Sequence, residues 1–318
     1  YTIPILREAA LHEPASAHPG VPTRETLPFE REISVRNLSF RFTEESRELF
    51  HGLTLTIRKG ERIGIRGASG AGKTTLFNLL LGLYEPTGGK ITIDGTPLTS
   101  ANRRAWQNRI GYVSQNLFIA DGSFAANVAL GVPDNEIDRG RVAEALEAAR
   151  LGEFVAGLAK GMDTHVGECG CRLSGGQRQR IGIARALAPE PELLLLDEPL
   201  GALDLQLRRQ MQLELKRLQK KLGITFVYIT HDQEEAINMS DRIAVMRGGR
   251  FEQLGTPEEI YDEPKTHYVA QFIGRSTILS GRVEAVGKDT AVIRGACGSF
   301  TADASRARLS AGEDCEIC

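Results

Sequence analysis

The segment 67–74 has the residue types and spacing of a loop that binds phosphate. Its sequence, GASGAGKT, fits the pattern GxxxxGK[ST], in which glycines let backbone N–H groups turn inward around phosphate oxygens. The start of the helix that follows adds a partial positive charge. Lys73 would bridge the β and γ phosphates of a nucleoside triphosphate, and the Thr74 hydroxyl would ligate Mg²⁺. We expect ATP to be held here by Gly67, Ser69, Gly70, Gly72, Lys73, Thr74 and Thr75.

A strand that ends in two acids would supply the second half of such a site. Four leucines at 193–196 precede Asp197 and Glu198, and an apolar run of this kind is typical of a strand buried on both faces. Asp197 would then lie near the Mg²⁺ ion, and Glu198 would polarise the attacking water as a general base. The two acids could instead cap the next helix, but their pairing with the loop at 67–74 favours hydrolysis.

A second helix start suited to anions lies at 174–177. Ser174, Gly175, Gly176 and Gln177 open the helical run RQRIGIARAL, and backbone N–H groups at such a helix start bind anions. One chain therefore has two helix starts that can bind phosphate, one after the loop at 67–74 and one at 174–177. A single ATP needs both of them. We expect a head-to-tail homodimer, in which each ATP lies between the loop at 67–74 of one chain and the segment 174–177 of the other.

These segments need a scaffold, and the apolar patterns predict a mixture of helices and strands. Short apolar strands at 61–67, 193–196 and 224–230 alternate with helical segments, which is typical of a parallel sheet covered on both faces. Between Ile33 and Ile57 apolar residues alternate with polar ones, which favours an antiparallel sheet with one buried face. The long stretch between the first two parallel strands is rich in Ala, Glu and Arg, so a helical subdomain is expected there.

A long amphipathic helix is expected at 203–222. One apolar stripe contains Leu207, Met211, Leu215, Leu218 and Leu222, at the spacing of a helix with one buried face. A nucleic-acid surface is conceivable on the basic side of this helix, but the net charge of −2 gives no general reason to expect that partner. We interpret the surrounding basic residues as a solvated face: Arg208, Arg209, Lys216, Arg217, Lys220 and Lys221.

Together these motifs resemble the nucleotide-binding domains of ABC transporters over about residues 30–275. LSGGQ at 173–177 resembles the family signature, Gln115 in YVSQ the Q-loop, and the segment from Gly201 to Asp204 the D-loop. His231 in YITHD resembles the switch histidine, and Phe42 in SFRF falls where an aromatic ring stacks on adenine. Two residues depart from the usual pattern: Gly201 replaces a serine, and Phe42 replaces the commoner tyrosine.

The resemblance implies a role for each matched residue. Gln115 would sense Mg²⁺ and couple to the membrane subunit, His231 would contact the γ-phosphate, and Asp204 would belong to the nucleotide-binding set. The implied fold is an α/β fold of the P-loop NTPase (ABC ATPase) type, with an antiparallel β subdomain, a helical subdomain at about 115–185 and a truncated C-terminal β domain.

The two halves of the chain resemble different branches of that family. DGSFAANVALG at 121–131 and VGECG at 166–170 are similar to exporter or flippase ATPases. From about Asp197 to the end, the sequence is similar to importer ATPases, above all those of spermidine/putrescine uptake. We expect ATP-driven import of polyamines or similar small solutes, with the ATPase of an exporter or a lipid-linked oligosaccharide flippase as the alternative.

The expected domains follow from these boundaries: a proline-rich linker at 1–28, the nucleotide-binding domain at 29–275 and a partial regulatory β domain at 276–318. No apolar stretch approaches the ~20 residues that cross a bilayer, and the start of the sequence lacks the pattern of a secretory signal. We therefore expect a peripheral protein on the cytoplasmic face of the inner membrane, bound to integral membrane permease subunits and not to nucleic acid.

Two other functions remain open at this point. A soluble ABC ATPase acting on DNA or ribosomes would generally have long coiled-coil insertions or tandem ATPase domains, whereas this sequence has one set of motifs and no sustained heptads. A non-hydrolysing interaction module would be either folded but uncoupled or unable to fold across the seam between the two halves, where mismatched core packing could defeat folding. Glu198 and His231 are both present, so the sequence favours an active ATP hydrolase.

Overall fold

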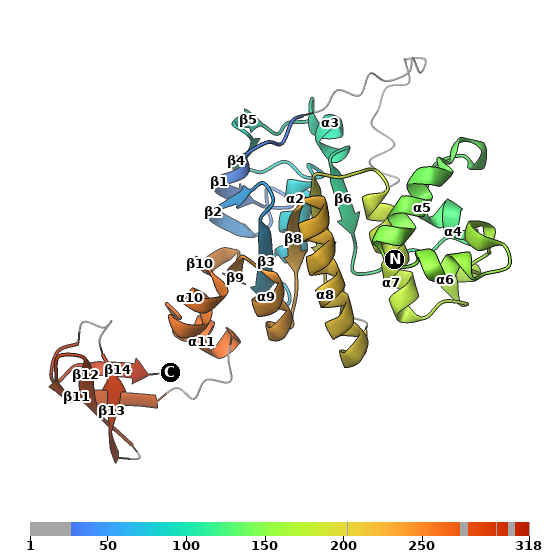
Figure 1. Ribbon diagram of the computed structural model, residues 1–318. Helices are drawn as coiled ribbons and strands as arrows, with labels where there is room; N and C mark the ends of the chain where they lie inside the picture. Colours follow the sequence, from blue (N-terminus) through green and yellow to red (C-terminus); the bar gives the residue numbers. More distant parts are fainter. Residues whose placement is uncertain (1–26, 202, 274–278, 297, 305–308, 318) are drawn as a thin grey trace.

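The computed structural model describes residues 27–317 except 202, 274–278, 297 and 305–308 (Figure 1). The proline-rich linker predicted at 1–28 lies outside the described residues, apart from its last two. Within the described ranges, no helix is both long enough and apolar enough to cross a bilayer.

An antiparallel sheet with the strand order β2-β1-β4-β5 forms the first layer of the described chain. Its strands are β1 Glu32–Phe40, β2 Phe50–Arg58, β4 Gly88–Ile93 and β5 Thr96–Pro97. Ile33 of β1 pairs with Ile57 of β2, and both side chains are fully buried. Since alternate residues of a strand point to the same face, the alternating pattern places one face of this sheet in the core, and the predicted antiparallel pairing is confirmed.

The central sheet has the strand order β10-β9-β3-β8-β7-β6 in the described chain. Its strands are β3 Arg62–Gly67, β6 Ile110–Val113, β7 Leu193–Asp197, β8 Thr225–Ile229, β9 Arg242–Arg247 and β10 Arg250–Gly255. The neighbouring pairs from β9 to β6 are parallel, and β10 joins the edge as the antiparallel half of a hairpin. The predicted parallel sheet is confirmed at β3, β7 and β8, and it also contains the parallel strands β6 and β9 and the antiparallel edge strand β10, which were not predicted.

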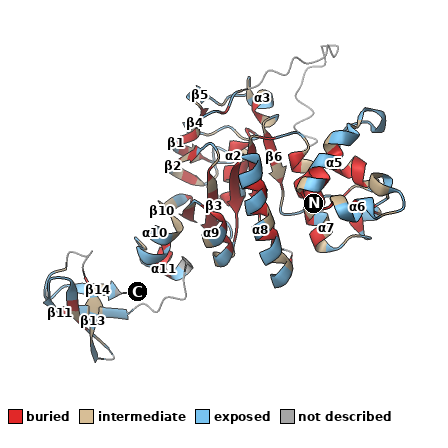
Figure 2. Cartoon of the chain, in the orientation of Figure 1, coloured by how far each residue is buried: buried red, intermediate tan, exposed pale blue. Residues whose placement is uncertain are grey.

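Both faces of the central sheet are covered. Leu193 and Leu195 belong to a hydrophobic cluster shared with the antiparallel sheet and helix α2 Lys73–Leu80. Leu194 and Leu196 point the other way and belong to a second cluster with the helices that follow β6 and β7. All four side chains are fully buried, and Figure 2 shows buried residues concentrated along these strands.

Most of the chain between β6 and β7 is helical, and these green helices lie to one side of the central sheet in Figure 1. Gly111 of β6 allows the last of them to pack closely, because a Cβ there would lie 2.3 Å from the carbonyl oxygen of Ala186. The helices here are α4 Phe124–Val128, α5 Arg139–Ala148, α6 Gly152–Ala156 and α7 Gly175–Leu187, with 3-10 turns η1 Asp134–Glu136, η2 Gly161–Asp163 and η3 Glu168–Gly170, while the short α3 Arg103–Gln107 precedes β6.

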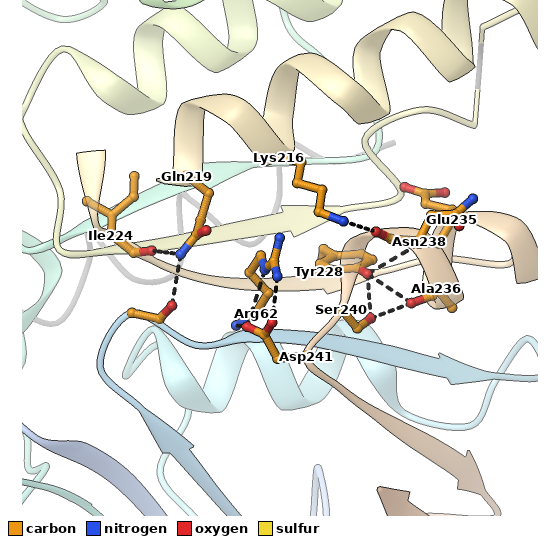
Figure 3. A network of polar contacts seen from close by, with 11 residues as sticks. Arg62, Lys216, Gln219, Ile224, Tyr228, Glu235, Ala236, Asn238, Ser240 and Asp241 are labelled. Carbon is orange, nitrogen blue, oxygen red and sulfur yellow. Dashed lines mark hydrogen bonds and ion pairs between the residues drawn. The ribbon is translucent and has the colours of Figure 1, made fainter. Parts of the chain in front are cut away.

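Helices α8 Leu205–Leu222 and α9 Gln233–Met239 pack side by side next to β8 (Figures 1 and 3). Met211, Leu215 and Leu218 of the predicted apolar stripe are buried, but Leu222, the last residue of α8, is 43% exposed. Lys216 of the predicted solvated face is exposed, and its ammonium group also donates to the carbonyl oxygen of Asn238 at 3.0 Å (Figure 3).

A buried hydroxyl holds α9 on the sheet. The Tyr228 hydroxyl lies 2.5 Å from the Ser240 hydroxyl, which in turn donates to the carbonyl oxygen of Ala236 at 2.6 Å (Figure 3). Burial raises the pKa of Tyr228 far above its usual range, so the hydroxyl stays protonated. On the same side of the sheet, the guanidinium of Arg62 pairs with Asp241 at 2.5 Å.

We expect Tyr228→Phe to lower the free energy of unfolding by about 1–2 kcal/mol, because the buried hydrogen bond is lost and the Ser240 hydroxyl loses a partner. Chemical denaturation of the variant beside the wild type measures this. Tyr261→Phe is the matched control, since Tyr261 is 59% exposed and its loss of a hydroxyl should change stability by less than about 0.5 kcal/mol. Equal effects of the two variants would contradict the role of the Tyr228 hydroxyl.

The C-terminal part of the described chain forms a small antiparallel sheet with the order β13-β12-β11-β14. Its core is small, consisting of Val283, Ala291, Ile293 and Ala304, and most of its surface is exposed in Figure 2. This sheet agrees with the β domain that the implied fold has at its C-terminal end. The elements from β10 onward are α10 Pro257–Asp262, α11 His267–Ile273, β11 Leu279–Val286, β12 Thr290–Gly295, β13 Gly298–Asp303 and β14 Asp314–Ile317.

Candidate functional site

The loop between β3 and α2 closes around the side chain of Lys73. Gly70 and Gly72 have φ of 78° and 100°, in the left-handed region that favours glycine. Lys73 is 7% exposed, and its Nζ donates to the carbonyl oxygens of Gly67 at 2.8 Å and Ala68 at 2.9 Å. The loop thus fixes an ammonium group beside the start of a helix, which is the arrangement that phosphate binding requires.

Gly72 is constrained by its neighbours as well as by its backbone angle. A Cβ at this position would lie 2.5 Å from the ring of Phe50. Two other residues of the predicted nucleotide-binding set lie on the same loop and helix: Ser69 is exposed before the helix starts, and Thr75 is half-buried in its first turn. Burial lowers the pKa of Lys73, and the nearby carboxylates of Glu198 and Asp197 act in the opposite direction.

Thr74 and Asp197 come together although they are far apart in the sequence. Thr74 lies in the first turn of α2, Asp197 ends β7, and the threonine Oγ1 donates to the Asp197 carboxylate at 3.0 Å. Asp197 is 3% exposed, and burial raises its pKa, an effect that the Thr74 hydrogen bond opposes. A hydroxyl and a buried carboxylate at this separation are hard oxygen donors of the kind that Mg²⁺ prefers.

Glu198 lies at the meeting point of three chain segments. Its carboxylate accepts a hydrogen bond from Gln115 Nε2 at 2.8 Å and contacts His231 Nε2 at 2.5 Å. Glu198 itself has φ 49°, a left-handed conformation that is unusual for a residue with a side chain. Gln115, Glu198 and His231 each follow a strand of the parallel sheet, β6, β7 and β8, and the carboxyl ends of parallel strands lie at one edge.

Tyr112 is a neighbour of this site that the sequence did not reveal. It lies on β6 and packs against Phe77 of α2 with ring centroids 6.4 Å apart. Burial, and then the charge of Asp197 beside its hydroxyl, raise the pKa of Tyr112 to about 12. The hydroxyl is therefore a neutral hydrogen-bond donor near the Asp197 carboxylate at ordinary pH. In the sequence, the one signal for a place near the site is that Tyr112 stands one residue before the end of β6.

The predicted anion-binding helix start at 174–177 is formed by a reciprocal cap. Ser174 Oγ accepts a hydrogen bond from the Gln177 N–H at 3.2 Å, and Gln177 Oε1 accepts one from the Ser174 N–H at 2.8 Å. Gly176 is buried against α8, and the packing is so close that a Cβ there would lie 2.5 Å from the side chain of Leu207. Helix α7 lies among the green helices beside β6, whereas α2 lies on the central sheet (Figure 1). The structure of one chain therefore does not bring Ser174, Gly175, Gly176 and Gln177 together with Lys73.

The segment between β7 and α8 is fixed at both ends. The Gly201 N–H donates to the carbonyl oxygen of Glu198 at 3.3 Å, and Asp204 caps α8 by accepting a hydrogen bond from the Leu207 N–H at 2.9 Å. A Cβ at Gly201 would be 3.7 Å from its nearest neighbour, an ordinary contact distance. The fold therefore does not require glycine at 201, and a serine would fit.

Phe42 presents an exposed aromatic ring. Its side chain is 58% exposed, and its ring stands edge-on to those of Phe40 and Tyr84, with centroids 5.1 Å and 5.9 Å away. An exposed ring held in a fixed orientation by two others is suited to stacking on a flat, aromatic ligand.

Two further charged residues near the site were not among the predicted site residues. Glu235 of α9 is 3% exposed and accepts a hydrogen bond from the Thr230 hydroxyl. Burial raises the pKa of Glu235 to about 7. Arg208 of α8 was expected on a solvated face, but it pairs with Asp232 at 3.0 Å. Both lie with Glu198 and His231 around a polar cavity of about 370 Å³.

Comparison with known proteins gives three kinds of match. The family model described as ABC transporter matches residues 50–201. The spermidine/putrescine import ATP-binding protein of Thermobifida fusca is 45% identical over 291 residues, covering 89% of this chain and 72% of the relative. The corresponding protein of Acidothermus cellulolyticus is 46% identical over 256 residues, covering 78% of this chain and 63% of that relative. The chain thus spans 63–72% of the length of these two proteins.

A solved structure of a bacterial Atm1-family ABC exporter with ATP bound also matches. Its TM-score is 0.69 at 31% sequence identity, and the match covers 80% of this chain and 43% of the exporter chain. The importer relatives and this exporter correspond to the two resemblances predicted from the sequence. The importer match extends over 89% of the chain, so that similarity is not confined to the C-terminal half.

Proposed function

Because the chain belongs to the ABC transporter family of ATP-binding proteins, we propose that it binds and hydrolyses ATP to drive transport across a membrane. The observation that carries this proposal is the convergence of Gln115, Glu198 and His231 next to the paired Thr74 and Asp197. Membership of the family also confirms the predicted fold class, an α/β fold of the P-loop NTPase type.

We propose the following roles at the reacting phosphate. Lys73 binds the β and γ phosphates, and His231 contacts the γ-phosphate. Glu198 accepts a proton from water as the water oxygen attacks the γ-phosphorus and the bond to the β-phosphate oxygen breaks. Gln115 and His231 hold the two oxygens of the Glu198 carboxylate, which keeps the base pointed in one direction.

A magnesium ion fits the donors that surround this position. Thr74, Asp197 and Gln115 would hold it, since a hydroxyl, a carboxylate and an amide oxygen are the hard ligands that it prefers. The buried carboxylate of Asp197, whose pKa is raised by burial, would be stabilised in its charged form by a cation. When bound, Mg²⁺ neutralises the charge that develops on the phosphate oxygens.

The adenine ring and the partner chain account for the remaining predicted residues. Phe42 would stack on adenine, and Gly67, Ser69, Gly70, Gly72 and Thr75 would shape the loop. The remaining predicted residues lie at the starts of two other helices, α7 and α8. We propose that these residues contact the ATP held by a second copy of the chain: Ser174, Gly175, Gly176, Gln177 and Asp204. The active form would then be a head-to-tail homodimer that encloses two ATP molecules.

The test of this proposal uses two variants that fail for different reasons. Lys73→Ala removes the phosphate-binding ammonium group, and Ser174→Arg blocks the helix start offered to the partner. Each variant alone should be inactive. In an equal mixture of the two variants, half of the dimers contain one chain of each kind. Each of these mixed dimers has one intact site of its two, so up to about a quarter of the wild-type rate should return.

The wild-type rate of ATP hydrolysis should also rise more than linearly with protein concentration in the range where dimers form. Phosphate release measured over a dilution series checks this. A strictly linear rate together with an inactive mixture would contradict a site shared between chains. Absence of hydrolysis in the wild type at every concentration would contradict the proposed enzyme activity itself.

We propose polyamines or similar small solutes as the transported cargo and import as the direction. The importer relatives are 45% and 46% identical to this chain, whereas the exporter is 31% identical, so export is the less supported alternative. The nucleotide-binding domain would occupy residues 29–275, with a helical subdomain at about 115–185 and a partial regulatory β domain at 276–318. Permease subunits would hold the protein at the cytoplasmic face of the inner membrane.

Uptake of labelled spermidine tests the cargo. A bacterial strain that lacks its own importer ATPase but retains the permease subunits should regain uptake when it expresses this chain, and should not when it expresses Glu198→Gln. Restored ATP hydrolysis without restored uptake would overturn the polyamine assignment and leave the ATPase intact.

A further inference from the structure

We propose that Arg208 is a positioning residue for ATP hydrolysis, which ties the segment after Glu198 to the loop that carries His231. Its guanidinium donates from Nη1 to the Asp232 carboxylate and from Nη2 to the carbonyl oxygen of Leu203, both at 3.0 Å. The planar fork of an arginine can hold two acceptors at once, whereas the ammonium of a lysine is a point charge. The inference deepens the proposed function and rests on it.

On one side, Arg208 controls the loop of the switch histidine through Asp232. The other oxygen of the Asp232 carboxylate accepts hydrogen bonds from the N–H groups of Glu234 at 2.8 Å and Glu235 at 3.3 Å, which caps α9. The Asp232 N–H donates to the Thr230 hydroxyl at 3.0 Å, and that hydroxyl donates to Glu235. Thr230 and Asp232, the two residues that flank His231, are therefore both held by hydrogen bonds.

On the other side, Arg208 reaches the segment that leads back to the proposed general base. Leu203 is 6% exposed, and its carbonyl oxygen is the acceptor for Arg208. Two residues earlier, the Gly201 N–H donates to the carbonyl oxygen of Glu198. Since His231 contacts the Glu198 carboxylate, a closed ring leads from Glu198 through Leu203, Arg208 and Asp232 to His231, made of these contacts and of the short stretches of backbone between them.

The ring surrounds a polar cavity, so hydrogen bonds decide where its members lie. Glu198, Arg208, His231 and Asp232 all line the cavity of about 370 Å³. Side chains around such a space lack the close apolar packing that fixes positions in a core. Removing the fork of Arg208 would therefore remove this tie between the two segments, and small misplacements of catalytic groups can lower a rate up to about a hundredfold.

The far ends of the two helices are held independently of Arg208. Lys216 of α8, two turns further along the same face, donates to the carbonyl oxygen of Asn238 at the end of α9, and Gln219 donates to that of Ile224 at 2.9 Å (Figure 3). Tyr228 and Ser240 hold α9 on the sheet. A change at Arg208 should thus loosen the ring while leaving the helices in place.

The next residue on α8 provides a matched control. Arg209 pairs with Glu234 of the same neighbouring helix at 3.4 Å, but both side chains are more than 60% exposed. Arg209→Gln therefore removes the same charge from the same helix without touching Leu203 or Asp232. Exposed ion pairs of this kind contribute little.

The first test is independent of nucleotide. Hydrogen–deuterium exchange of the isolated chain should be about tenfold faster at the amides around His231 in Arg208→Gln, and within about twofold of wild type in Arg209→Gln. Unchanged exchange in Arg208→Gln would overturn the inference.

The second test measures hydrolysis. Arg208→Gln and Arg208→Lys should both lower kcat about tenfold or more with KM for ATP within about twofold, because the phosphate-binding loop is untouched. Arg209→Gln should keep the wild-type kcat. A normal kcat in Arg208→Lys would show that a charge suffices and would overturn the bridging role, as would a parallel loss of ATP binding. If wild type and Arg209→Gln also fail to hydrolyse ATP, the proposed function fails and not this inference alone.

Discussion

Replacing Glu198 with glutamine is expected to lower the rate of ATP hydrolysis by at least about a hundredfold, the usual contribution of a general base. Glutamine has the same shape and can keep the contacts with Gln115 Nε2 and His231 Nε2 that hold Glu198 now. It cannot accept the proton of the attacking water. ATP binding should be retained, because Lys73 and the loop around it are unchanged.

Two measurements on the same protein check this expectation. Steady-state phosphate release gives the loss of rate, and light scattering in the presence of ATP should show the chain accumulating as a dimer, since the nucleotide is bound but not consumed. Glu234→Gln is the control, because that carboxylate is exposed on the first turn of α9. A Glu198→Gln protein that keeps more than a tenth of the wild-type rate would place the base elsewhere.

The free energy of unfolding should fall as the pH rises from about 4.5 to about 7, because of Glu235. Burial raises the pKa of this carboxyl from 4.5 to about 7 in the folded chain, where the charges of Asp232 and Glu198 add to burial and the Thr230 hydrogen bond and Arg208 oppose it. Between these values the folded chain holds a proton that the unfolded chain has lost. The stabilisation is therefore complete below about pH 4.5 and lost by about pH 7, and amounts to roughly 3 kcal/mol.

Glu235→Gln isolates this contribution from the other groups that titrate in the same window. Glutamine keeps an acceptor for the Thr230 hydroxyl and stays neutral at every pH. Chemical unfolding of both proteins at a series of pH values should show the wild type losing stability relative to the variant as the pH rises. The same pH dependence in both proteins would mean that Glu235 does not keep its proton in the folded chain, and Glu234→Gln, which changes an exposed carboxylate, should follow the wild type.

The parts of the site that could be predicted are those that depend on short segments. The loop at 67–74 has its chemistry and its strand and helix within a few residues, so the pattern alone indicated it. The leucines at 193–196 likewise indicated the strand that ends at Asp197, next to Glu198. Gln115 and His231 were assigned to the site only through the resemblance to ABC transporter ATPases, and the strand β6 before Gln115 was not predicted.

The parts that could not be predicted depend on partners far along the chain. Arg208 looked like one of several basic residues around an amphipathic helix, and only its contacts with Leu203 and Asp232 distinguish it from Arg209. Glu235 was not singled out in the sequence; it lies in the first turn of α9, where an acid is favourable even when exposed, yet its side chain is buried against Thr230. The periodicity of a sequence indicates which face of a helix is apolar. It does not indicate which residues from other segments the polar side chains of that helix will contact.

The left-handed backbone of Glu198 sets stability and chemistry against each other at a single position. A residue with a side chain at φ 49° carries a conformational cost of about 1 kcal/mol that glycine would avoid and asparagine would reduce. Neither replacement has a carboxylate to accept a proton. Selection for thermal tolerance alone would thus favour replacing glutamate here, and under the role proposed for Glu198 only selection for turnover would keep it. Under the role proposed for Glu198, natural variation at this residue would separate lineages that depend on hydrolysis from those that only bind nucleotide.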